Sequence, residues 1–233
     1  MTLAECFEIN GLSGYLTEKK AEKLEFLSRY LIEYNKRINI TALTEPSDIY
    51  AKHIADSAAL LPLLSGAGAL LDVGCGGGFP SLPVAILNEK INVTSMDSTE
   101  KKLGFIVEIK EKLNLNNINV LPGRAEELCK DGLRQSFDAV TARAVASLPV
   151  LCELCLPYVK RGGIFAAMKT DLSELDASAN AARILGAKNT ENVSYKLKYG
   201  GGEADRCIIV YKKIKDTDMK YPRRYSQIKA KPL

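Results

Sequence analysis

The sequence predicts an α/β fold with a mostly parallel, seven-stranded sheet, an antiparallel hairpin at one edge, and additional helices at the N-terminus. Five short apolar segments between residues 69 and 168 alternate with helical stretches, as in consecutive βαβ units with parallel strands. Two further apolar segments flank a turn that contains Gly200, Gly201 and Gly202, which favours a hairpin. Ahead of them, residues before 65 show the apolar spacing of helices.

The spacing of apolar residues gives approximate bounds for each element. Thr17 and Ser47 are the expected N-caps of the first two helices, and the linker 65–68 consists of small residues. We expect an N-terminal helical extension at 1–64, a core at 65–212 and a basic tail at 213–233. The expected helices are 17–38, 47–61, 80–88, 99–113, 147–159 and 172–185, and the expected strands are 69–73, 91–96, 118–121, 137–141, 163–168, 193–198 and 206–211.

Length and composition indicate one globular domain with a substantial core, because 46% of the 233 residues are apolar. No apolar run reaches the roughly 20 residues of a membrane span, and the first residues do not resemble a secretory signal. The six cysteines have no regular spacing, so we expect reduced thiols in a cytoplasmic protein. Cys152 and Cys155 form a CxxC inside an apolar helical pattern, which favours core packing over a metal site. We expect no metal and a monomer.

The positive charge of the chain is concentrated at its C-terminus. Residues 212–233 hold eight lysines or arginines and two aspartates, a net charge of +6, whereas the rest of the chain has a net charge of −2. A basic tail on a nearly neutral body favours a polyanionic partner. A solubilising end without a partner is the equally weighted alternative.

A glycine-rich turn follows the first expected strand, in the segment Asp72–Pro80. Glycines allow a tight turn and let a ligand approach the backbone. A dinucleotide fingerprint would need glycine at position 79, where this chain has Phe79. The spacing is instead DxGxGxG, the form that S-adenosylmethionine-dependent methyltransferases use. The predicted fold is therefore a Rossmann-like class I methyltransferase fold.

Two further signals lie at the ends of the next two expected strands. Asp97 follows Asp72 by 25 residues and ends the second strand, where a carboxylate can accept hydrogen bonds from both hydroxyls of a ribose. The segment 123–127 follows the third strand and is expected near an adenine. Together the three signals predict a nucleotide-type cofactor.

The residues after the fourth expected strand narrow the chemistry by elimination. The segment Thr141–Ala146 lacks the (N/D)PP(Y/F) motif of enzymes that methylate exocyclic amines. The chain has no Pro-Cys dipeptide, which pyrimidine C5 methylation typically uses. Guanine N7 already carries a nucleophilic lone pair, so its methylation needs positioning and no general base. We therefore assign no catalytic acid or base.

Several segments resemble the bacterial 16S rRNA guanine-N7 methyltransferases, the family of glucose-inhibited division protein B, and the resemblance runs nearly end to end. The departures are Tyr34 for the family's Trp, Lys52 for Arg and Ser81 for Gly, together with the absence of a Gly-x-Pro in the tail. The matching segments are Tyr34–Thr41, Lys52–Ser57, Asp72–Pro83, Arg124–Glu126, Thr141–Ala146, Lys169, Tyr221–Arg223 and Lys231–Leu233.

The resemblance implies a cytoplasmic enzyme that uses S-adenosylmethionine and methylates a guanine in the decoding-region loop of 16S rRNA, as free RNA or in the small subunit. For Arg143, at the end of the fourth strand, contact with cofactor or guanine is favoured over a structural role, and Phe79 packs beside the cofactor or in the core. The cofactor-binding candidates from motif and resemblance together are Asp72, Gly74, Gly76, Gly78, Phe79, Asp97, Ser98, Thr99, Ala125, Glu126 and Arg143.

The substrate candidates carry two interpretations each. His53, Asp56 and Ser57 share one helix face behind the loop that contains Asn39, and they either wall a substrate pocket or tie the N-terminal helices to the core. Lys169, at the end of the fifth strand, meets a phosphate or is solvated. The tail cations expected to contact phosphates are Arg223, Arg224, Lys229 and Lys231.

Three other functions remain as alternatives. A small-molecule methyltransferase would use the same glycine loop, but the basic tail argues against it. Phe79 argues against a nicotinamide-dependent oxidoreductase. The intact Asp72, Gly74 and Asp97 argue against a non-catalytic RNA-binding module.

Overall fold

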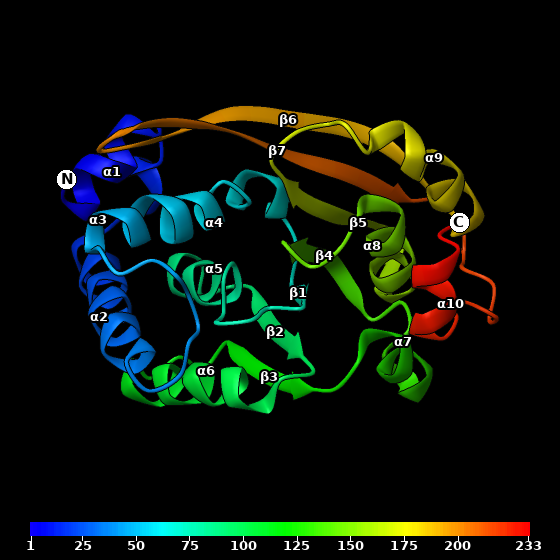
Figure 1. The fold of residues 1–233 in the computed structure, drawn as a ribbon, viewed down its shortest axis with the longest axis horizontal. Helices are drawn as coiled ribbons and strands as arrows, with labels where there is room; N and C mark the ends of the chain where they lie inside the picture. The colour runs from blue at the N-terminus through cyan, green and yellow to red at the C-terminus, as the bar shows by residue number, and fades with distance from the viewer.

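The computed structural model describes residues 1–233, apart from the side chain of Asp131, and a seven-stranded sheet runs through its centre (Figure 1). The strand order is β3-β2-β1-β4-β5-β7-β6, with the first five strands parallel and β7 antiparallel to both of its neighbours. This confirms the predicted fold class and the edge hairpin. The strands are β1 (Ala69–Val73), β2 (Asn92–Asp97), β3 (Ile118–Pro122), β4 (Phe137–Arg143), β5 (Val159–Lys169), β6 (Ala187–Tyr199) and β7 (Gly202–Lys213).

The helices agree with the expected ones in the core and differ near both ends of the chain. Three short helices, α1, α7 and α10, were not predicted, because none is long enough to show a helical repeat of apolar residues. The α-helices are α1 (Leu3–Ile9), α2 (Glu18–Asn35), α3 (Pro46–Ile49), α4 (Asp56–Ala58), α5 (Ser81–Leu87), α6 (Glu100–Lys112), α7 (Ala125–Leu128), α8 (Leu148–Cys155), α9 (Leu175–Ile184) and α10 (Tyr225–Ala230).

The expected helix at 47–61 is not one continuous α-helix. It begins at Pro46 with Glu45 as N-cap, so Ser47 is not the cap, in keeping with the preference of proline for the first helical position. A π-helical segment η2 (Tyr50–Ala55) separates α3 from α4, and a 3₁₀ helix η3 (Leu61–Leu64) follows. π-helical turns widen a helix locally and are frequent at functional sites.

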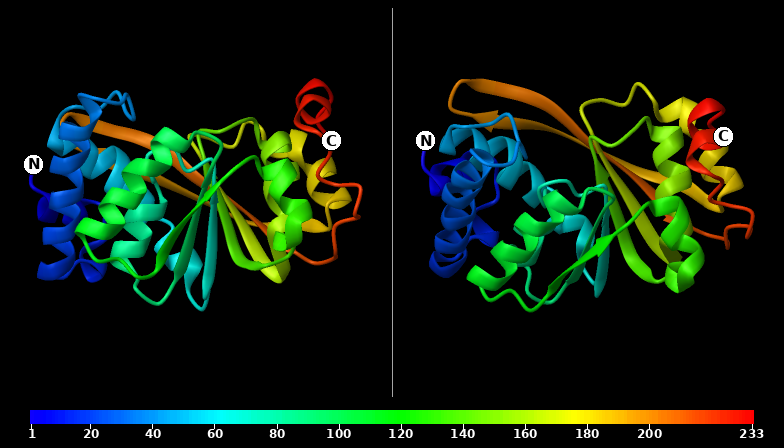
Figure 2. Two further views of the ribbon diagram at one scale, coloured as in Figure 1. Left: turned by 90° about the horizontal axis from the view of Figure 1, so that it is seen from below. Right: turned by 60° about the horizontal axis from the view of Figure 1, so that its bottom comes forward.

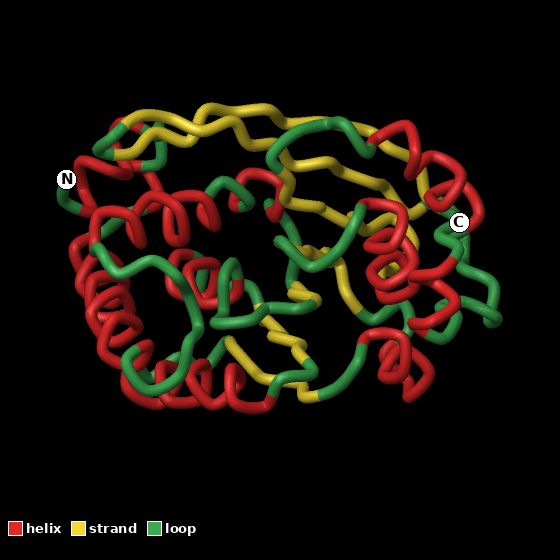
Figure 3. The backbone as a smooth tube through the Cα atoms, in the orientation of Figure 1, coloured by secondary structure: helices red, strands yellow, loops and turns green.

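Alternating side chains along the strands divide the interior into two cores, one on each face of the sheet. On β5, Ala166 and Met168 face the N-terminal helices with α5 and α6, whereas Phe165 and Ala167 face α8 and α9. Figures 2 and 3 show the two helical layers on opposite sides of the sheet. The N-terminal helices therefore share a core with the sheet, and α10 packs into the other core through Ile228.

The cysteines are consistent with the interpretation as core residues. All six are free and buried, and Cys152 and Cys155 lie in α8 against the sheet. Among the described residues, no group of three or more His, Cys, Asp or Glu side chains is placed to hold a metal ion. No helix of the described residues is long and apolar enough to cross a membrane.

The edge hairpin is longer than predicted and reaches across the molecule to the N-terminus (Figure 1). The Asn10 side chain, which follows α1, accepts from the backbone N–H of Lys198 at 2.9 Å and donates to its carbonyl at 3.0 Å. This contact holds the far end of the hairpin against α1. It also places Tyr195 and Arg206 beside the π-helical segment η2.

Candidate functional site

The glycine loop lies between β1 and α5, and its conformation explains two of its glycines. Gly74 and Gly78 have φ values of +72° and +83°, in the left-handed region that favours glycine. A Cβ on Gly74 would lie 2.5 Å from Val145 Cγ2, and one on Gly78 would lie 2.7 Å from Leu82 Cδ1. The first and third glycines therefore let the loop pack closely against its neighbours.

Asp72 lies beneath this loop and is completely buried. Its Oδ2 accepts from the Ser81 hydroxyl and, at 3.3 Å, from the Ser81 N–H, whereas its Oδ1 has no partner among the described residues. Burial raises the pKa of this carboxyl to about 6. Ser81, the departure from the family's glycine, thus supplies the carboxylate with two donors. Asp72 shapes the loop from below and does not reach the ligand side.

A cavity of about 470 Å³ opens above the loop, at the carboxyl ends of β1, β2 and β4. Open α/β sheets bind ligands at this edge. We call it the first cavity, and it is lined by Ile40, Thr41, His53, Val73, Gly74, Cys75, Gly76, Gly77, Phe79, Met96, Asp97, Ser98, Lys102, Gly123, Arg124, Ala125, Glu126, Arg143, Ala144, Val145, Leu154 and Tyr225.

Eight of the eleven predicted cofactor residues therefore lie on this cavity, and three do not. Asp72 and Gly78 pack behind the loop. Thr99 is the N-cap position of α6 and donates its N–H to Asp97 Oδ1 at 2.8 Å. Sequence reasoning missed Lys102 and Tyr225, because neither belongs to a recognised motif, whereas Arg124 lies in the segment 123–127 that was expected near the adenine.

Asp97 connects the parts of the first cavity. Its Oδ2 accepts from Gly76 N at 2.9 Å, its Oδ1 accepts from Thr99 N, and its carbonyl accepts from Gly123 N at 3.0 Å. One residue at the end of β2 thus fixes the glycine loop, the start of α6 and the turn after β3. The carboxylate lines the cavity and retains lone pairs for a ligand.

A second cavity of about 370 Å³ adjoins the first and shares His53, Arg143 and Ala144 with it. Four of its ten lining residues are lysines or arginines, and one is a buried carboxylate. We call it the second cavity, and its other lining residues are Lys52, Asp56, Met168, Lys169, Thr170, Tyr195 and Arg206.

Asp56 organises the second cavity from a position that is 3% exposed. Its Oδ2 accepts from Arg143 Nη1 at 3.1 Å, and its Oδ1 accepts from the Tyr195 hydroxyl at 2.8 Å. Arg206 Nε lies 3.5 Å from the same Oδ1. Burial, and next the Asp56 carboxylate, raise the pKa of Tyr195, so its hydroxyl stays protonated as a donor. Three segments distant in sequence converge on this one group.

His53 stands at the boundary between the two cavities. Its ring stacks on Phe79, with centroids 4.5 Å apart, and its Nε2 lies 2.8 Å from Thr41 Oγ1. Its Nδ1 lies 3.3 Å from Arg143 Nη2, which is a donor, and 3.2 Å from the Lys52 carbonyl oxygen, which is an acceptor. Burial and the Arg143 charge lower the pKa of His53 to about 4. The imidazole is therefore neutral at pH 7.

The contacts of this group include the tie to the core that was one of the two interpretations of the sequence. His53 and Asp56 line the second cavity, and they also tie the N-terminal segment to β4 through Arg143, which donates to the Lys52 carbonyl at 3.1 Å. Ser57 is buried, donates to the His53 carbonyl and lines neither cavity.

Asn39 is exposed and also lines neither cavity. The neighbouring Asn35 instead fixes its loop, accepting from the N–H groups of Ile40 and Thr41 and donating to the Thr41 carbonyl.

The expected phosphate contacts separate into paired and free cations. Lys169 pairs with Glu174 at 2.7 Å while lining the second cavity. Arg223 is held by the fully buried Glu153 at 2.6 Å, so its guanidinium has a structural partner that the sequence did not reveal. Arg224, Lys229 and Lys231 are exposed, and none of their side chains makes an ion pair among the described residues.

The strand order, the glycine loop after β1 and the carboxylate at the end of β2 define a class I methyltransferase fold with a cavity at the carboxyl ends of its strands. Solved methyltransferase structures share the fold. Precorrin-6y C5,15-methyltransferase from Geobacter metallireducens matches with a TM-score of 0.53 at 17% identity, covering 76% of this chain and 91% of that one. TYW2 from M. jannaschii, in complex with AdoMet, matches with a TM-score of 0.52 at 16% identity, covering 63% and 69%.

The chain belongs to the GidB family, rRNA small subunit methyltransferase G, whose model matches residues 20–201. A relative from Lactobacillus acidophilus, named ribosomal RNA small subunit methyltransferase G, is 40% identical over 97% of this chain and 96% of its own length. A relative of the same name from Streptococcus gordonii is 39% identical over the full length of both chains.

Proposed function

We propose that this protein is a cytoplasmic, monomeric enzyme that transfers the methyl group of S-adenosylmethionine to N7 of a guanine in the decoding-region loop of 16S rRNA. The names of its relatives support an rRNA substrate in the small subunit. The resemblance in sequence implies the guanine and its N7 atom. The single observation that carries the proposal is the junction of two cavities at Arg143, one suited to a nucleoside cofactor and one to an anionic nucleotide.

The first cavity fits S-adenosylmethionine. Asp97 would accept hydrogen bonds from the two ribose hydroxyls, as its position at the end of β2 allows. The N–H groups of Ala125 and Glu126 begin α7 and have no intrahelical acceptor, so they are available to adenine nitrogens. Arg143, Lys102 and Arg124 supply positive charge on the walls. When bound, S-adenosylmethionine supplies an electrophilic methyl group on its sulfonium sulfur.

The second cavity fits a nucleotide. Lys52, Lys169 and Arg206 would attract a backbone phosphate, because lysine and arginine provide most phosphate contacts in protein–nucleic acid complexes. The Phe79–His53 stack at the shared wall offers an apolar edge to a base that enters between the cavities.

The chemistry requires alignment and no proton transfer before methylation. Guanine N7 reacts through a lone pair that is already available, and the neutral His53 beside the junction adds no charge that would repel the developing positive base. Arg143 is held by Asp56 and the Lys52 carbonyl, so its orientation is fixed before either ligand binds. Such preorganisation is the main contribution that these residues make to the rate.

The test is methyl transfer to RNA that lacks the modification. Purified protein is incubated with methyl-labelled S-adenosylmethionine and small subunits or 16S rRNA, and N7-methylguanine is mapped by borohydride–aniline cleavage. One cleavage in the decoding-region loop is the expected result. Label transfer without cleavage would overturn the assignment of the N7 atom. No label transfer to either RNA would overturn the assignment of 16S rRNA as the substrate.

A further inference from the structure

We propose that Tyr225, in the C-terminal segment 214–233, is a cofactor-binding residue whose ring forms the adenine side of the first cavity. The inference rests on the proposed function, because it assumes that the first cavity holds S-adenosylmethionine. The sequence alone predicted this segment to be a basic tail for RNA. The structure instead places Tyr225 among the residues that line the first cavity.

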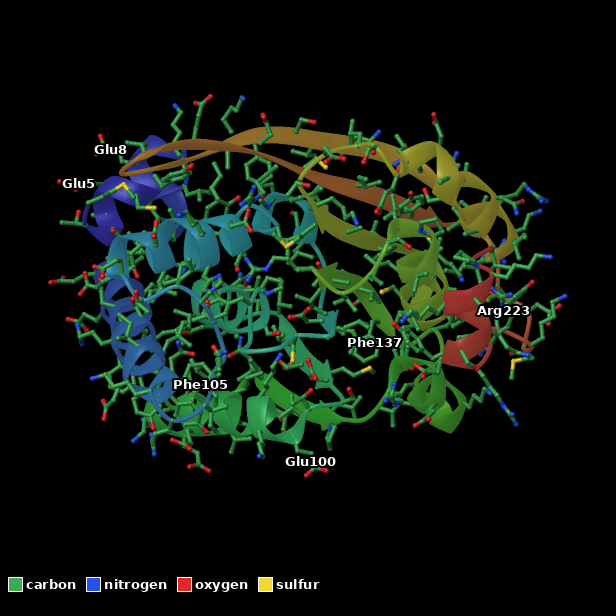
Figure 4. The ribbon with its side chains drawn as sticks, in the orientation of Figure 1. Glu5, Glu8, Glu100, Phe105, Phe137 and Arg223 are labelled. Carbon is green, nitrogen blue, oxygen red and sulfur yellow. The ribbon has the colours of Figure 1, made fainter. Side chains whose placement is uncertain are left out.

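A buried ion pair anchors the segment just before Tyr225. Glu153 of α8 is 0% exposed and accepts four hydrogen bonds from Arg223, one from its backbone N–H at 2.9 Å and three from its guanidinium at 2.6–3.2 Å. Arg223 Nη2 also donates to the Lys231 carbonyl at 3.1 Å, which joins the two ends of α10. Figure 4 labels Arg223 beside α10.

Two more cations hold the approach to this helix. Arg134 donates to the Thr217 carbonyl at 3.1 Å and to the Tyr221 carbonyl. The buried Lys213 ammonium donates to the Leu156 and Leu185 carbonyls at 2.9 and 2.8 Å and to the Thr217 hydroxyl. Ile228 then buries completely in the core beside α8. These contacts fix the segment 214–233 to the rest of the protein, and they thereby determine the position of Tyr225.

The surroundings of Tyr225 identify the part of the ligand that it would contact. Leu154 of α8 lines the same cavity, as do Ala125 and Glu126 of α7, and both α7 and α10 pack against α8. Because Asp97 would hold the ribose, the space between these residues would receive the adenine. The Tyr225 ring is partly exposed, and its hydroxyl has no hydrogen-bond partner among the described residues. An aromatic ring in such a place can stack on or pack beside a base.

The experiment compares two ligands by isothermal titration calorimetry of the full-length protein: S-adenosylmethionine, and 5′-methylthioadenosine, which lacks the amino-acid half. We expect Tyr225→Ala to weaken both ligands about tenfold, the usual cost of losing one aromatic contact to a base. Tyr225→Phe should stay within about twofold of the wild type because it keeps the ring. Gln227→Ala, an exposed change on the same helix, serves as the matched control and should bind both ligands normally.

Thermal unfolding of each variant separates binding from folding, and Tyr225→Leu provides a second variant that keeps apolar packing without a ring. Leucine binding both ligands as tightly as tyrosine would overturn the inference, as would unchanged affinities for Tyr225→Ala. If the wild type binds neither ligand, the proposed cofactor itself is wrong. If the wild type binds both and the variants bind equally well, the proposed function stands and only the role of Tyr225 is overturned.

Discussion

The two cavities that meet at Arg143 are built in different ways. The first consists largely of backbone turns that follow β1, β2 and β3, with Asp97 bonded to three of those turns. The second consists of side chains from segments far apart in the sequence, gathered around the single carboxylate of Asp56. The first cavity therefore depends on local sequence and loop geometry, whereas the second depends on one charge that holds distant elements together.

The largest effect on the first cavity is expected from a substitution of Asp97. We expect Asp97→Ala to weaken S-adenosylmethionine binding about 100-fold, because two hydrogen bonds to a charged acceptor are lost at about 1.5 kcal/mol each. Calorimetric titration measures the affinity, and circular dichroism checks the fold. Asp176→Ala on α9 is the control, since that carboxylate is exposed and lies on neither cavity. Affinity within threefold of the wild type would show that Asp97 only organises the loop.

A substitution of Asp56 tests how the second cavity is held together. We expect Asp56→Asn to lower the free energy of unfolding by about 2 kcal/mol, because bonds from Arg143 and Tyr195 to a buried carboxylate lose their charge. The affinity for S-adenosylmethionine should fall less than it does for Asp97→Ala, because Asp56 acts on the first cavity only through Arg143. Urea denaturation gives the first quantity and calorimetric titration the second.

A matched control for Asp56 lies on β7, in the hairpin that contacts Asp56. Asp205→Asn removes an exposed ion pair with Lys196 at 2.7 Å and should cost less than about 1 kcal/mol. Equal losses for the two variants would contradict the view that Asp56 holds the second cavity together.

The difference between the cavities also explains what could be predicted from the sequence. The glycine loop and Asp97 were recognised because their spacing follows from the geometry of one βαβ unit, and the mostly parallel sheet was predicted from the alternation of apolar and helical segments. Tyr195 and Arg206 were missed because nothing local marks them, and only the length of the hairpin brings them to Asp56. Asp72 was predicted as a cofactor-binding residue from its motif, but it is fully buried and does not line the first cavity, since burial is not visible in a spacing.

The C-terminal segment shows the same limit. Its charge was evident, but the partner of Arg223 is Glu153, which lies 70 positions earlier in an apolar helix and looks unremarkable there. Tyr225 reaches the first cavity only because that pair and the Arg134 contacts fix the chain. The composition indicated that the C-terminal segment is rich in cations. The structure shows which of these cations anchor the segment and which face solvent.

His53, at the boundary, should report on both cavities. It is the one histidine in the chain, so its ring protons can be assigned in an NMR titration without ambiguity. We expect a pKa near the value of about 4 that burial and Arg143 impose, so no titration should appear between pH 6 and 8.

Because the folded-state pKa of His53 lies below the unfolded value, the unfolded chain takes up a proton first as the pH falls. Stability should therefore decline below about pH 6.5, by less than about 1 kcal/mol between pH 7 and pH 6. His53→Gln should flatten that decline. Since Arg143 is the second cause of the shift, Arg143→Met should raise the pKa part of the way, and a midpoint near 6.5 in the wild type would contradict the buried position of the ring.

The smallest effect is expected outside both cavities, at the exposed cations of the C-terminal segment. Neutralising Arg224, Lys229 and Lys231 together should lower the slope of log affinity for RNA against log salt by about 2, since each phosphate contact contributes about 0.7 to 0.9. Neutralising three exposed lysines elsewhere, Lys19, Lys90 and Lys188, changes the net charge equally and should leave the slope nearly unchanged. Arg223 stays intact in both variants because it anchors Tyr225 through Glu153. Equal slopes in the two variants would mean that the segment serves the first cavity alone, whereas a selective drop would give it a second role, in which one anchored segment contacts the cofactor on its inner side and the RNA on its outer side.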